Sequence, residues 1–180
     1  VINVEGAEAD DVIAVLSARL APHGNVLILS SDKDFGQLQK YPNVEQFSPI
    51  EKKTIRPNGT PQEVLMEHII RGDRGDGVPN IFSPADVFVT GGRQKPIREV
   101  NVEQWKKMKP EEFITDPVVM ANFERNKQLV DLTQIPQDLR SEIVSTFVRQ
   151  RDAKANTPTN LLPFFIANDL SNLIEHIAEF

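Results

Sequence analysis

An uninterrupted apolar run, Val26-Leu27-Ile28-Leu29, constrains the fold of this chain more than any other feature. Turn-forming residues flank it, and such a run is typical of a strand buried on both faces of a parallel sheet. Further strand patterns cover residues 1–4, 44–47 and 53–55, and helical patterns cover residues 7–20, 35–40 and 61–70. This alternation predicts an α/β fold with a partly parallel sheet flanked by helices.

The helix predicted at 61–70 has clear signals at both ends. Thr60 is its expected N-cap, Pro61 takes the first helical position, Glu63 completes a capping box, and Gly72 ends the helix. Beyond residue 80 the strand patterns stop, and helices are predicted at 117–130, 137–151, 160–168 and 171–179. The α/β part is therefore expected to be followed by a mainly helical C-terminal region.

The composition excludes several kinds of site. The chain contains no cysteine, and its three histidines are widely separated, so disulfides, thiolate sites and a histidine-based zinc site are not expected. No apolar run is long enough to span a membrane and no secretory signal opens the chain, so a cytoplasmic location is expected, in the host cell if a phage encodes the chain. The chain is also expected to be a monomer. The chain begins at Val1 without an initiator Met, which we interpret as the start of a fragment.

Acidic residues stand at the ends of predicted elements in three separate segments. Each segment alone could serve helix capping or a turn. Acids directly after a parallel strand, however, lie where α/β sheets bind ligands, and carboxylates gathered at one place repel one another unless a cation separates them. The three segments contain Glu8, Asp10 and Asp11, then Asp32 and Asp34, and finally Asp73 and Asp76. Such a set predicts a site for a hard, oxygen-ligated metal ion. It also makes the net charge of −6 a weak argument against nucleic-acid binding.

The joint pattern of these segments resembles the 5′-nuclease (flap endonuclease) family. Glu-Ala-Asp-Asp on a helix is followed by a strand with Ser-x-Asp-Lys-Asp-Phe-x-Gln-Leu, and then by Gly-Asp-x-x-Asp, in the family's order and near its spacing. The family includes flap endonucleases, the 5′-nuclease domain of bacterial DNA polymerase I, and phage exonucleases. The phage ribonucleases H among them resemble this chain over essentially its whole length.

The resemblance implies an enzyme that cleaves phosphodiester bonds near 5′ ends, with two Mg²⁺ ions for which Mn²⁺ can substitute. It implies that Asp10, Asp32, Asp34 and Asp73 are catalytic. The first metal then belongs with Glu8, Asp10 and Asp32, with Asp11 as an outer member, and the second with Asp34, Asp73 and Asp76.

The resemblance also implies a division of the chain and a set of partners. Residues 1–72 correspond to the C-terminal part of the α/β nuclease core, and 73–180 to a helical region with a helix–turn–helix-type DNA-binding segment. The expected substrate is DNA or an RNA–DNA duplex with a 5′ end or flap. Replisome proteins such as a sliding clamp or single-strand-binding protein are further candidates.

Two departures from the family accompany this resemblance. Its first acidic residues and its helical arch have no counterpart here, so weak metal binding and little activity are expected of the isolated chain. After Gly77-Val78 the glycine-rich Gly-Ile-Gly turn of many members is missing. The presence of a potassium site is therefore left undecided, whereas a role in duplex binding is still expected.

Basic and aromatic residues suggest further contacts. Candidate nucleic-acid contacts are Lys33, Lys52, Lys53, Arg71 and Arg74. The basic group at 106–109 is interpreted as solvated surface, and Trp105 as core. The segment 160–165 is similar to a clamp-binding motif but lacks its glutamine, so it is interpreted as helix core.

Two alternative functions remain. An apolar strand followed by Asp32-Lys33-Asp34 also resembles the nucleophile motif of haloacid dehalogenase-type phosphatases. Against this alternative, Gly36 replaces the expected Thr or Val, and Asp73 follows a predicted helix rather than a strand. The other alternative is a non-catalytic fragment that binds DNA or replisome proteins.

Overall fold

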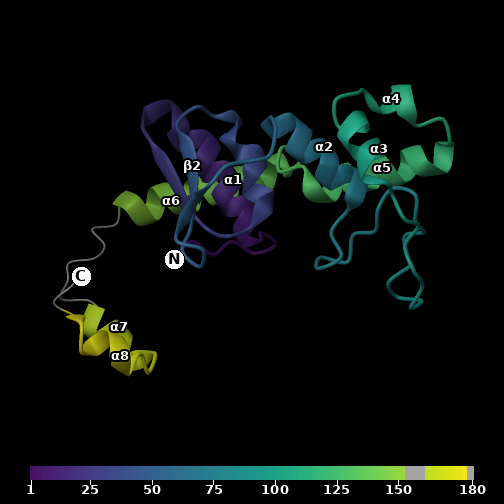
Figure 1. The fold of residues 1–180 in the computed structure, drawn as a ribbon. Coiled ribbons are helices and arrows are strands. Elements are labelled where there is room, and N and C mark those ends of the chain that lie inside the picture. Colours follow the sequence, from purple (N-terminus) through teal and green to yellow (C-terminus); the bar gives the residue numbers. More distant parts are fainter. Residues whose placement is uncertain (153–160, 178–180) are drawn as a thin grey trace.

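The computed structural model of the chain describes residues 1–152 and 161–177. Helical segments and strands both occur up to residue 55, and the described elements after it are all helices. In order they are α1 (Ala9–Leu20), η1 (Ala21–His23), β1 (Val26–Leu29), η2 (Lys33–Lys40), β2 (Val44–Ser48), β3 (Lys53–Ile55), α2 (Pro61–Arg71), α3 (Glu99–Trp105), α4 (Pro110–Phe113), α5 (Pro117–Val130), α6 (Gln137–Asp152), α7 (Leu161–Ala167) and α8 (Ser171–Ile174). In Figure 1, α2 lies between the part that contains the sheet and the part that contains α3, α4 and α5.

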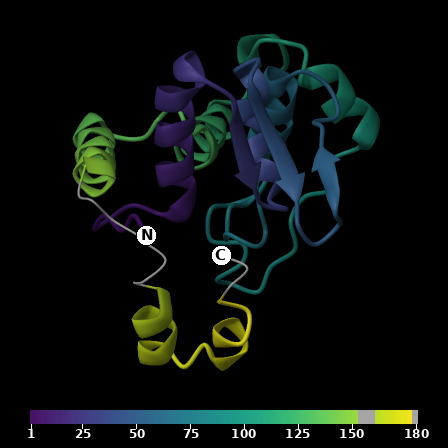
Figure 2. The ribbon, with the colours of Figure 1, turned by 90° about the vertical axis from the view of Figure 1, so that its left-hand side faces the viewer.

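The three strands form one small mixed sheet in the order β1-β2-β3. β1 pairs with β2 in parallel, with Val26 opposite Val44, and β2 pairs with β3 in antiparallel fashion, with Gln46 opposite Ile55. Figure 2 shows the strands side by side with α1 next to them. The predicted α/β fold with a partly parallel sheet flanked by helices is confirmed.

β1 is buried on one face only, so the prediction that both its faces are covered is wrong. Ile28 is buried, whereas Leu27 and Leu29 are 59% and 65% exposed. The reason is position: β1 is an edge strand, and among the described residues only the side facing α1 is packed. An apolar run alone does not show how many layers cover it.

Two apolar clusters hold the described part together. The first joins α1, β1, η2 and α6, with Val15, Ile28, Phe35 and Ile143 among its buried side chains. The second joins α2, α3 and α5 and includes Ile70, Val102 and Phe123. The contact between α2 and η2 brings the two clusters together, so the acidic loops at the ends of β1 and α2 lie near their junction.

A buried asparagine fixes the loop that follows α2. Asn126 on α5 is fully buried, and its side-chain amide donates hydrogen bonds to the carbonyls of Ile69 (2.9 Å) and Pro79 (2.7 Å). One side chain therefore ties α5 to both the end of α2 and the far end of the 72–79 loop. Such a buried bridge restricts the positions that Asp73 can take.

Several sequence-based boundaries need correction. Residues 1–4 form no strand, and 35–40 belong to a 3₁₀ segment that begins at Lys33. Two short helices, α3 and α4, were not predicted. α8 is shorter than the predicted 171–179, of which residues 178 and 179 lie outside the described part. The division at residue 72 stays a prediction.

Near α3, Trp105 lies where the sequence predicts it, whereas Lys106 does not. Trp105 packs in the second cluster, stacked on Phe113 with ring centroids 5.2 Å apart, as predicted. The interpretation of Lys106 as solvated surface is wrong. Its side chain is only 4% exposed, and its ammonium lies 2.6 Å from a carboxylate oxygen of Glu103 and 3.4 Å from one of Glu67.

The segment similar to a clamp-binding motif lies largely in α7. Phe165 is buried, while Phe164 is half exposed. Residue 160 of the segment lies outside the described residues. None of the described helices is both long and apolar enough to cross a membrane.

Candidate metal centre

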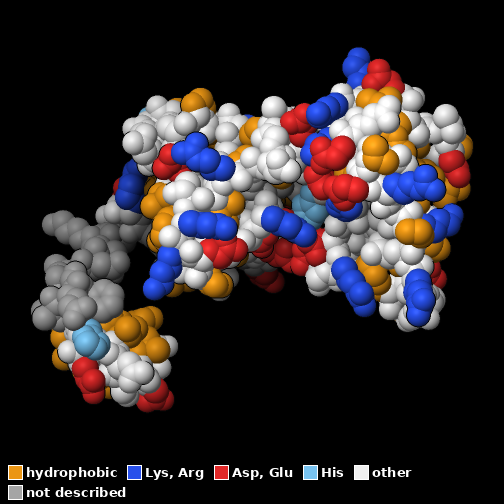
Figure 3. All heavy atoms as spheres, viewed as in Figure 1, with side chains coloured by type: hydrophobic (Ala, Val, Ile, Leu, Met, Phe, Trp, Pro, Cys, Tyr) orange, Lys and Arg blue, Asp and Glu red, His pale blue; other side chains and the backbone are white. Residues whose placement is uncertain are grey.

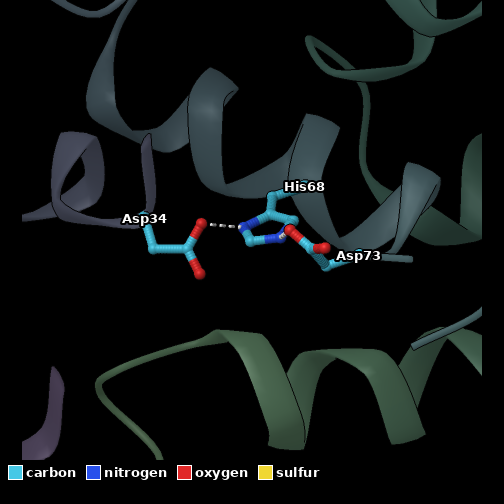
Figure 4. A group of neighbouring side chains, drawn as sticks. All are labelled: Asp34, His68 and Asp73. Carbon is cyan, nitrogen blue, oxygen red and sulfur yellow. Dashed lines mark ion pairs between the residues drawn. The ribbon is translucent and has the colours of Figure 1, made fainter. Parts of the chain in front are cut away.

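A histidine lies between two of the predicted acidic residues. His68 Nδ1 is 3.2 Å from Asp34 Oδ1, and His68 Nε2 is 3.5 Å from Asp73 Oδ2 (Figure 4). The three side chains come from η2, α2 and the loop after α2. Their potential ligand atoms all lie within 4.8 Å of one another, which is compact enough to share one metal ion.

The turn after β1 positions the first pair of acids. The Asp32 side chain caps η2 by accepting a hydrogen bond from the Asp34 N–H at 3.0 Å. This bond turns the chain so that Asp34 is half-buried against α2, while Asp32 stays exposed. The capping role that the sequence allowed for Asp32 is therefore present, and it serves to place Asp34.

The end of α2 positions the third acidic segment. Gly72 ends the helix with a φ of 64° and a ψ of −170°, a conformation that is essentially restricted to glycine. The next residue, Asp73, accepts a hydrogen bond from the Gly75 N–H at 2.7 Å and pairs as an isolated bridge with Val78. The Gly72 turn before Asp73 and the bridge to Val78 after it thus hold the Asp73 carboxylate beside His68.

Crowding of carboxylates raises proton affinity in the cluster. Burial, followed by the nearby Asp32 charge, raises the pKa of Asp34 to about 7. Burial and the neighbouring Asp32 carboxylate also raise the pKa of Asp10. These are the shifts expected where anions gather in the absence of a counter-cation.

The pKa values of Asp73 and His68, which lie close to Asp34, are lowered for different reasons. A hydrogen bond from Lys33 is the largest of the influences that lower the pKa of Asp73, and the two charged atoms are 2.7 Å apart. Burial, with the Lys33 charge second, lowers the pKa of His68. Burial therefore disfavours the protonated form of the imidazole.

The acids from the three segments converge on one place. The charges of Asp32 and Asp76 contribute to the raised pKa of Asp10, and those of Asp10 and Asp73 contribute to the raised pKa of Asp34. Glu8 and Asp11 flank Asp10, although the Asp11 carboxylate also accepts a hydrogen bond from the Glu8 N–H and so caps α1. In Figure 3, acidic side chains gather beside a histidine near the middle of the face shown.

The residues present fit a divalent cation. Asp34 Oδ1 and His68 Nε2 are buried without a hydrogen-bond partner, and an unpaired buried polar atom is costly unless something binds it. Carboxylate oxygens are the ligands that Mg²⁺ and Mn²⁺ prefer. His68 was not among the site residues predicted from the sequence. Its position near the C-terminal end of a helix that leads into an acidic loop is the signal that could have indicated it.

Known proteins resemble this chain along its whole length. A family model described as "T4 RNase H, C terminal" matches residues 59–180, and one described as "5'-3' exonuclease, N-terminal resolvase-like domain" matches residues 1–67. The ribonuclease H of Enterobacteria phage T4 is 31% identical over 192 residues, covering 100% of this chain. The chain belongs to the 5′-nuclease family that includes this phage ribonuclease H.

Two further members of the 5′-nuclease family match. DNA polymerase I of Rhizobium leguminosarum is 30% identical over 195 residues, which are 99% of this chain and 18% of the polymerase. Flap endonuclease Xni of Shewanella piezotolerans is 34% identical over 83 residues, or 42% of this chain and 32% of that protein. The chain spans 60% of the length of the phage T4 ribonuclease H.

Among solved structures, a T5 5′-exonuclease mutant is similar with a TM-score of 0.48 and 19% identity, over 81% of this chain and 67% of that chain. A T5 D15 protein co-crystallised with metal ions has a TM-score of 0.49 and the same identity, over 81% and 62%.

The basic residues predicted to contact nucleic acid differ in their distance from the acids of this 5′-nuclease chain and in their present partners. Lys33 adjoins Asp73, and Arg74 is exposed in the same loop. Arg71 is already paired with Glu67 at 2.8 Å and Glu99 at 2.5 Å. Lys52 is exposed in the turn between β2 and β3. Lys53 is the exposed first residue of β3, with its ammonium 2.7 Å from a carboxylate oxygen of Glu51.

A cleft of about 310 Å³ opens beside His68. Lys33, Arg56 and Arg71 contribute to its lining, together with Glu67. Cationic side chains next to an acidic centre suit a phosphodiester, whose negative charge would otherwise be repelled.

Proposed function

We propose that the protein containing this chain is a divalent-metal-dependent 5′-nuclease that hydrolyses phosphodiester bonds near 5′ ends. Its substrates would be DNA or RNA–DNA duplexes with a 5′ end or flap, as in primer removal during replication. The observation that carries the proposal is the convergence of acids from three segments on Asp34, where two buried polar atoms lack hydrogen-bond partners.

The acids divide between two cation positions in this proposal. Glu8, Asp10 and Asp32 would hold the first ion, with Asp11 outside them, and Asp34, Asp73 and Asp76 would hold the second. When bound, such ions activate water and stabilise the charge on the leaving oxygen. The chain's own contribution is to fix the carboxylates, through the Asp32 cap and the Gly72 turn, before substrate arrives. Mg²⁺ is the proposed ion, and Mn²⁺ a substitute.

The basic residues would position the phosphate backbone. Lys33 is the best placed, because its exposed ammonium already contacts Asp73 and can turn toward a phosphate. Arg74 and Lys52 are exposed and can make contacts at the surface. Lys53 must first leave Glu51, and Arg71 must leave two carboxylates. Phosphate contacts of this kind supply affinity without sequence preference. Binding of replisome proteins, a monomeric state and a cytoplasmic location belong to the same proposal.

Further polypeptide is proposed to complete the enzyme. The chain spans 60% of the length of the phage T4 ribonuclease H, and the exposed Leu27 and Leu29 leave an apolar face of β1 without a cover among the described residues. The catalytic rate of this chain alone is therefore expected to be low.

A chimaera tests the proposed function. The matched part of the phage T4 ribonuclease H is replaced by this chain, and cleavage of a 5′-labelled flap and of a primed RNA–DNA duplex is followed in Mg²⁺. Cleavage that is lost with Asp32→Asn or Asp34→Asn, yet retained with Glu45→Gln on the exposed side of β2, supports the proposal. The Asn variants should keep their fold and most of their DNA affinity, which depends mainly on basic residues.

Failure of that experiment has a defined form. If the folded chimaera binds the duplex but does not cleave it in Mg²⁺ or Mn²⁺, the chain is a nucleic-acid-binding part without catalytic function. If Asp34→Asn cleaves at the wild-type rate, the acidic cluster is not the catalytic centre. The phosphatase alternative predicts a covalent phosphate on Asp32, but Asp73 follows helix α2 rather than the strand that alternative requires.

A further inference from the structure

His68 differs from the acids around it because it is buried and its partners are incomplete. Its side chain is 9% exposed, and the buried Nε2 has no hydrogen-bond partner even though Asp73 Oδ2 is 3.5 Å away. Asp34 Oδ1, near the other ring nitrogen, is buried and unpartnered as well. Figure 4 shows the imidazole between the two carboxylates.

The imidazole is close to both carboxylates but is not satisfied by either. Nδ1 is 3.2 Å from Asp34 Oδ1 and Nε2 is 3.5 Å from Asp73 Oδ2, yet Asp34 Oδ1 and His68 Nε2 are buried without a hydrogen-bond partner. Buried polar atoms of this kind are costly unless something binds them. The arrangement of Asp34, His68 and Asp73 is therefore better suited to coordination than to a chain of hydrogen bonds.

The backbone keeps these three residues together. The Gly72 N–H donates to the His68 carbonyl at 2.8 Å, and the Val78 N–H donates to the Asp73 carbonyl at 2.7 Å. α2 also packs closely against η2, which carries Asp34. The three potential ligands thus come from segments whose relative positions are fixed by secondary structure.

One cation already competes for this place. The Lys33 ammonium is 2.7 Å from Asp73 Oδ2, the same oxygen that faces His68 Nε2. The Lys33 side chain is 67% exposed, so it can move into solvent when a divalent ion arrives. Its position marks the place as attractive to positive charge.

We propose that His68 supplies a nitrogen ligand, together with Asp34 and Asp73, to a cation site that binds Zn²⁺ or Co²⁺ ahead of Mg²⁺. Imidazole nitrogen favours these borderline ions, whereas carboxylate and water favour Mg²⁺. The inference deepens the proposed function, since it concerns the second of the two cation positions. It also revises the sequence-based expectation that only oxygen ligands take part.

Binding of Zn²⁺ and Mg²⁺ to the metal-free chain, measured by calorimetry, tests the inference. Compared with the wild type, His68→Gln should weaken Zn²⁺ binding by roughly 10- to 100-fold, the range common for residues that support metal sites. Its Mg²⁺ affinity should change by less than about threefold, because carboxylates dominate Mg²⁺ binding. His23→Gln, at an exposed histidine after α1, is the matched control and should change neither affinity.

A spectroscopic readout guards against a variant that fails to fold. Ring-nitrogen NMR of the wild type distinguishes the three histidines, and Zn²⁺ should shift the resonances of His68 while those of His23 stay in place. No shift at His68 overturns the proposal. An equal loss of Zn²⁺ and Mg²⁺ affinity in His68→Gln also overturns it, because His68 would then only position the acids.

The role of His68 and the proposed nuclease activity can fail separately, because the calorimetry and NMR measurements on His68 do not depend on cleavage. Zn²⁺ binding through His68 in a protein that cleaves nothing refutes the nuclease alone. Cleavage in Mg²⁺ without a nitrogen ligand refutes only the role given to His68.

Discussion

Replacing Gly72 by alanine is expected to damage the folded state far more than the same replacement at Gly77. Both glycines have a positive φ, 64° and 73° respectively. A Cβ added at Gly72 would lie 2.3 Å from the Val78 carbonyl oxygen and 2.6 Å from the Pro79 carbonyl oxygen, whereas a Cβ at Gly77 would meet nothing within 4 Å. The pair therefore compares a positive φ in open space with a glycine-only conformation that also brings the residue close to two carbonyls.

The magnitude follows from these two contributions. The positive φ costs an alanine about 1–2 kcal/mol at Gly77. At Gly72 the backbone cost is about 1–3 kcal/mol, because its ψ of −170° lies in a region essentially restricted to glycine. At Gly72 the overlap adds about 1–3 kcal/mol, typical of overpacking. The neighbouring carbonyls cannot easily yield, because the Pro79 oxygen accepts a hydrogen bond from the buried Asn126. Since about 1 kcal/mol shifts the melting temperature of a chain this size by roughly 2–4 °C, we expect losses of about 4–24 °C for Gly72→Ala and about 2–8 °C for Gly77→Ala.

Thermal and urea denaturation, followed by circular dichroism in EDTA, measure the difference. A calorimetric titration with Mn²⁺ then shows whether displacement of Asp73 weakens the metal centre, as we expect for Gly72→Ala only. If the two variants have the same free energy of unfolding, the tight backbone approach at Gly72 is not a feature of the folded protein. The reasoning that places Asp73 by this turn would then be refuted.

Three further predictions concern the residues around the cluster. Asn126→Ala should lower the free energy of unfolding by about 2–4 kcal/mol in urea denaturation, because it leaves two buried carbonyls without donors; a loss below 1 kcal/mol would contradict the bridge. Lys33→Ala should raise Mn²⁺ affinity by about two- to fivefold, the worth of an exposed ion pair, and lower affinity for duplex DNA; a change in the same direction for both ligands would count against its position. In EDTA, the melting temperature should fall as the pH rises from 4 to 7, because the folded state keeps the Asp34 proton up to a pKa of about 7 and the unfolded chain releases it near 3.8. Asp34→Asn should flatten this dependence of melting temperature on pH, and an unchanged slope would show that Asp34 does not cause it.

Local signals made much of the fold predictable. The apolar run of β1 is bounded by turn residues, and α2 has a capping box at Thr60 and Glu63, so the structure places both elements where the sequence predicts them. α3 and α4 escaped prediction because they are short, at 7 and 4 residues, and lack a long periodic pattern. Their formation depends on packing of Val102 and Phe113 against α2 and α5 rather than on local propensity.

The site could be predicted only in part for a similar reason. Acids such as Asp32 and Asp73 stand at element ends, where position along the chain is informative. The place of His68 depends on the rotation of α2 against η2, which no local pattern records. The ion pairs that bury Lys106 join α3 to Glu67 on α2, so its burial likewise depends on tertiary contacts.

The melting temperature of this chain in Mn²⁺ and in KCl of the same ionic strength tests most directly whether the acids form a specific divalent-cation site. An ion that binds only the folded form at 100 times its dissociation constant adds about 2.7 kcal/mol, or roughly 5–10 °C for a chain of this size, and a weak site gives less. We predict a modest rise in Mn²⁺, no matching rise in KCl, and loss of the Mn²⁺ effect in Asp34→Asn. Equal rises in both salts would show that general screening of acidic charge explains the effect, and would contradict a metal centre at Asp34, His68 and Asp73.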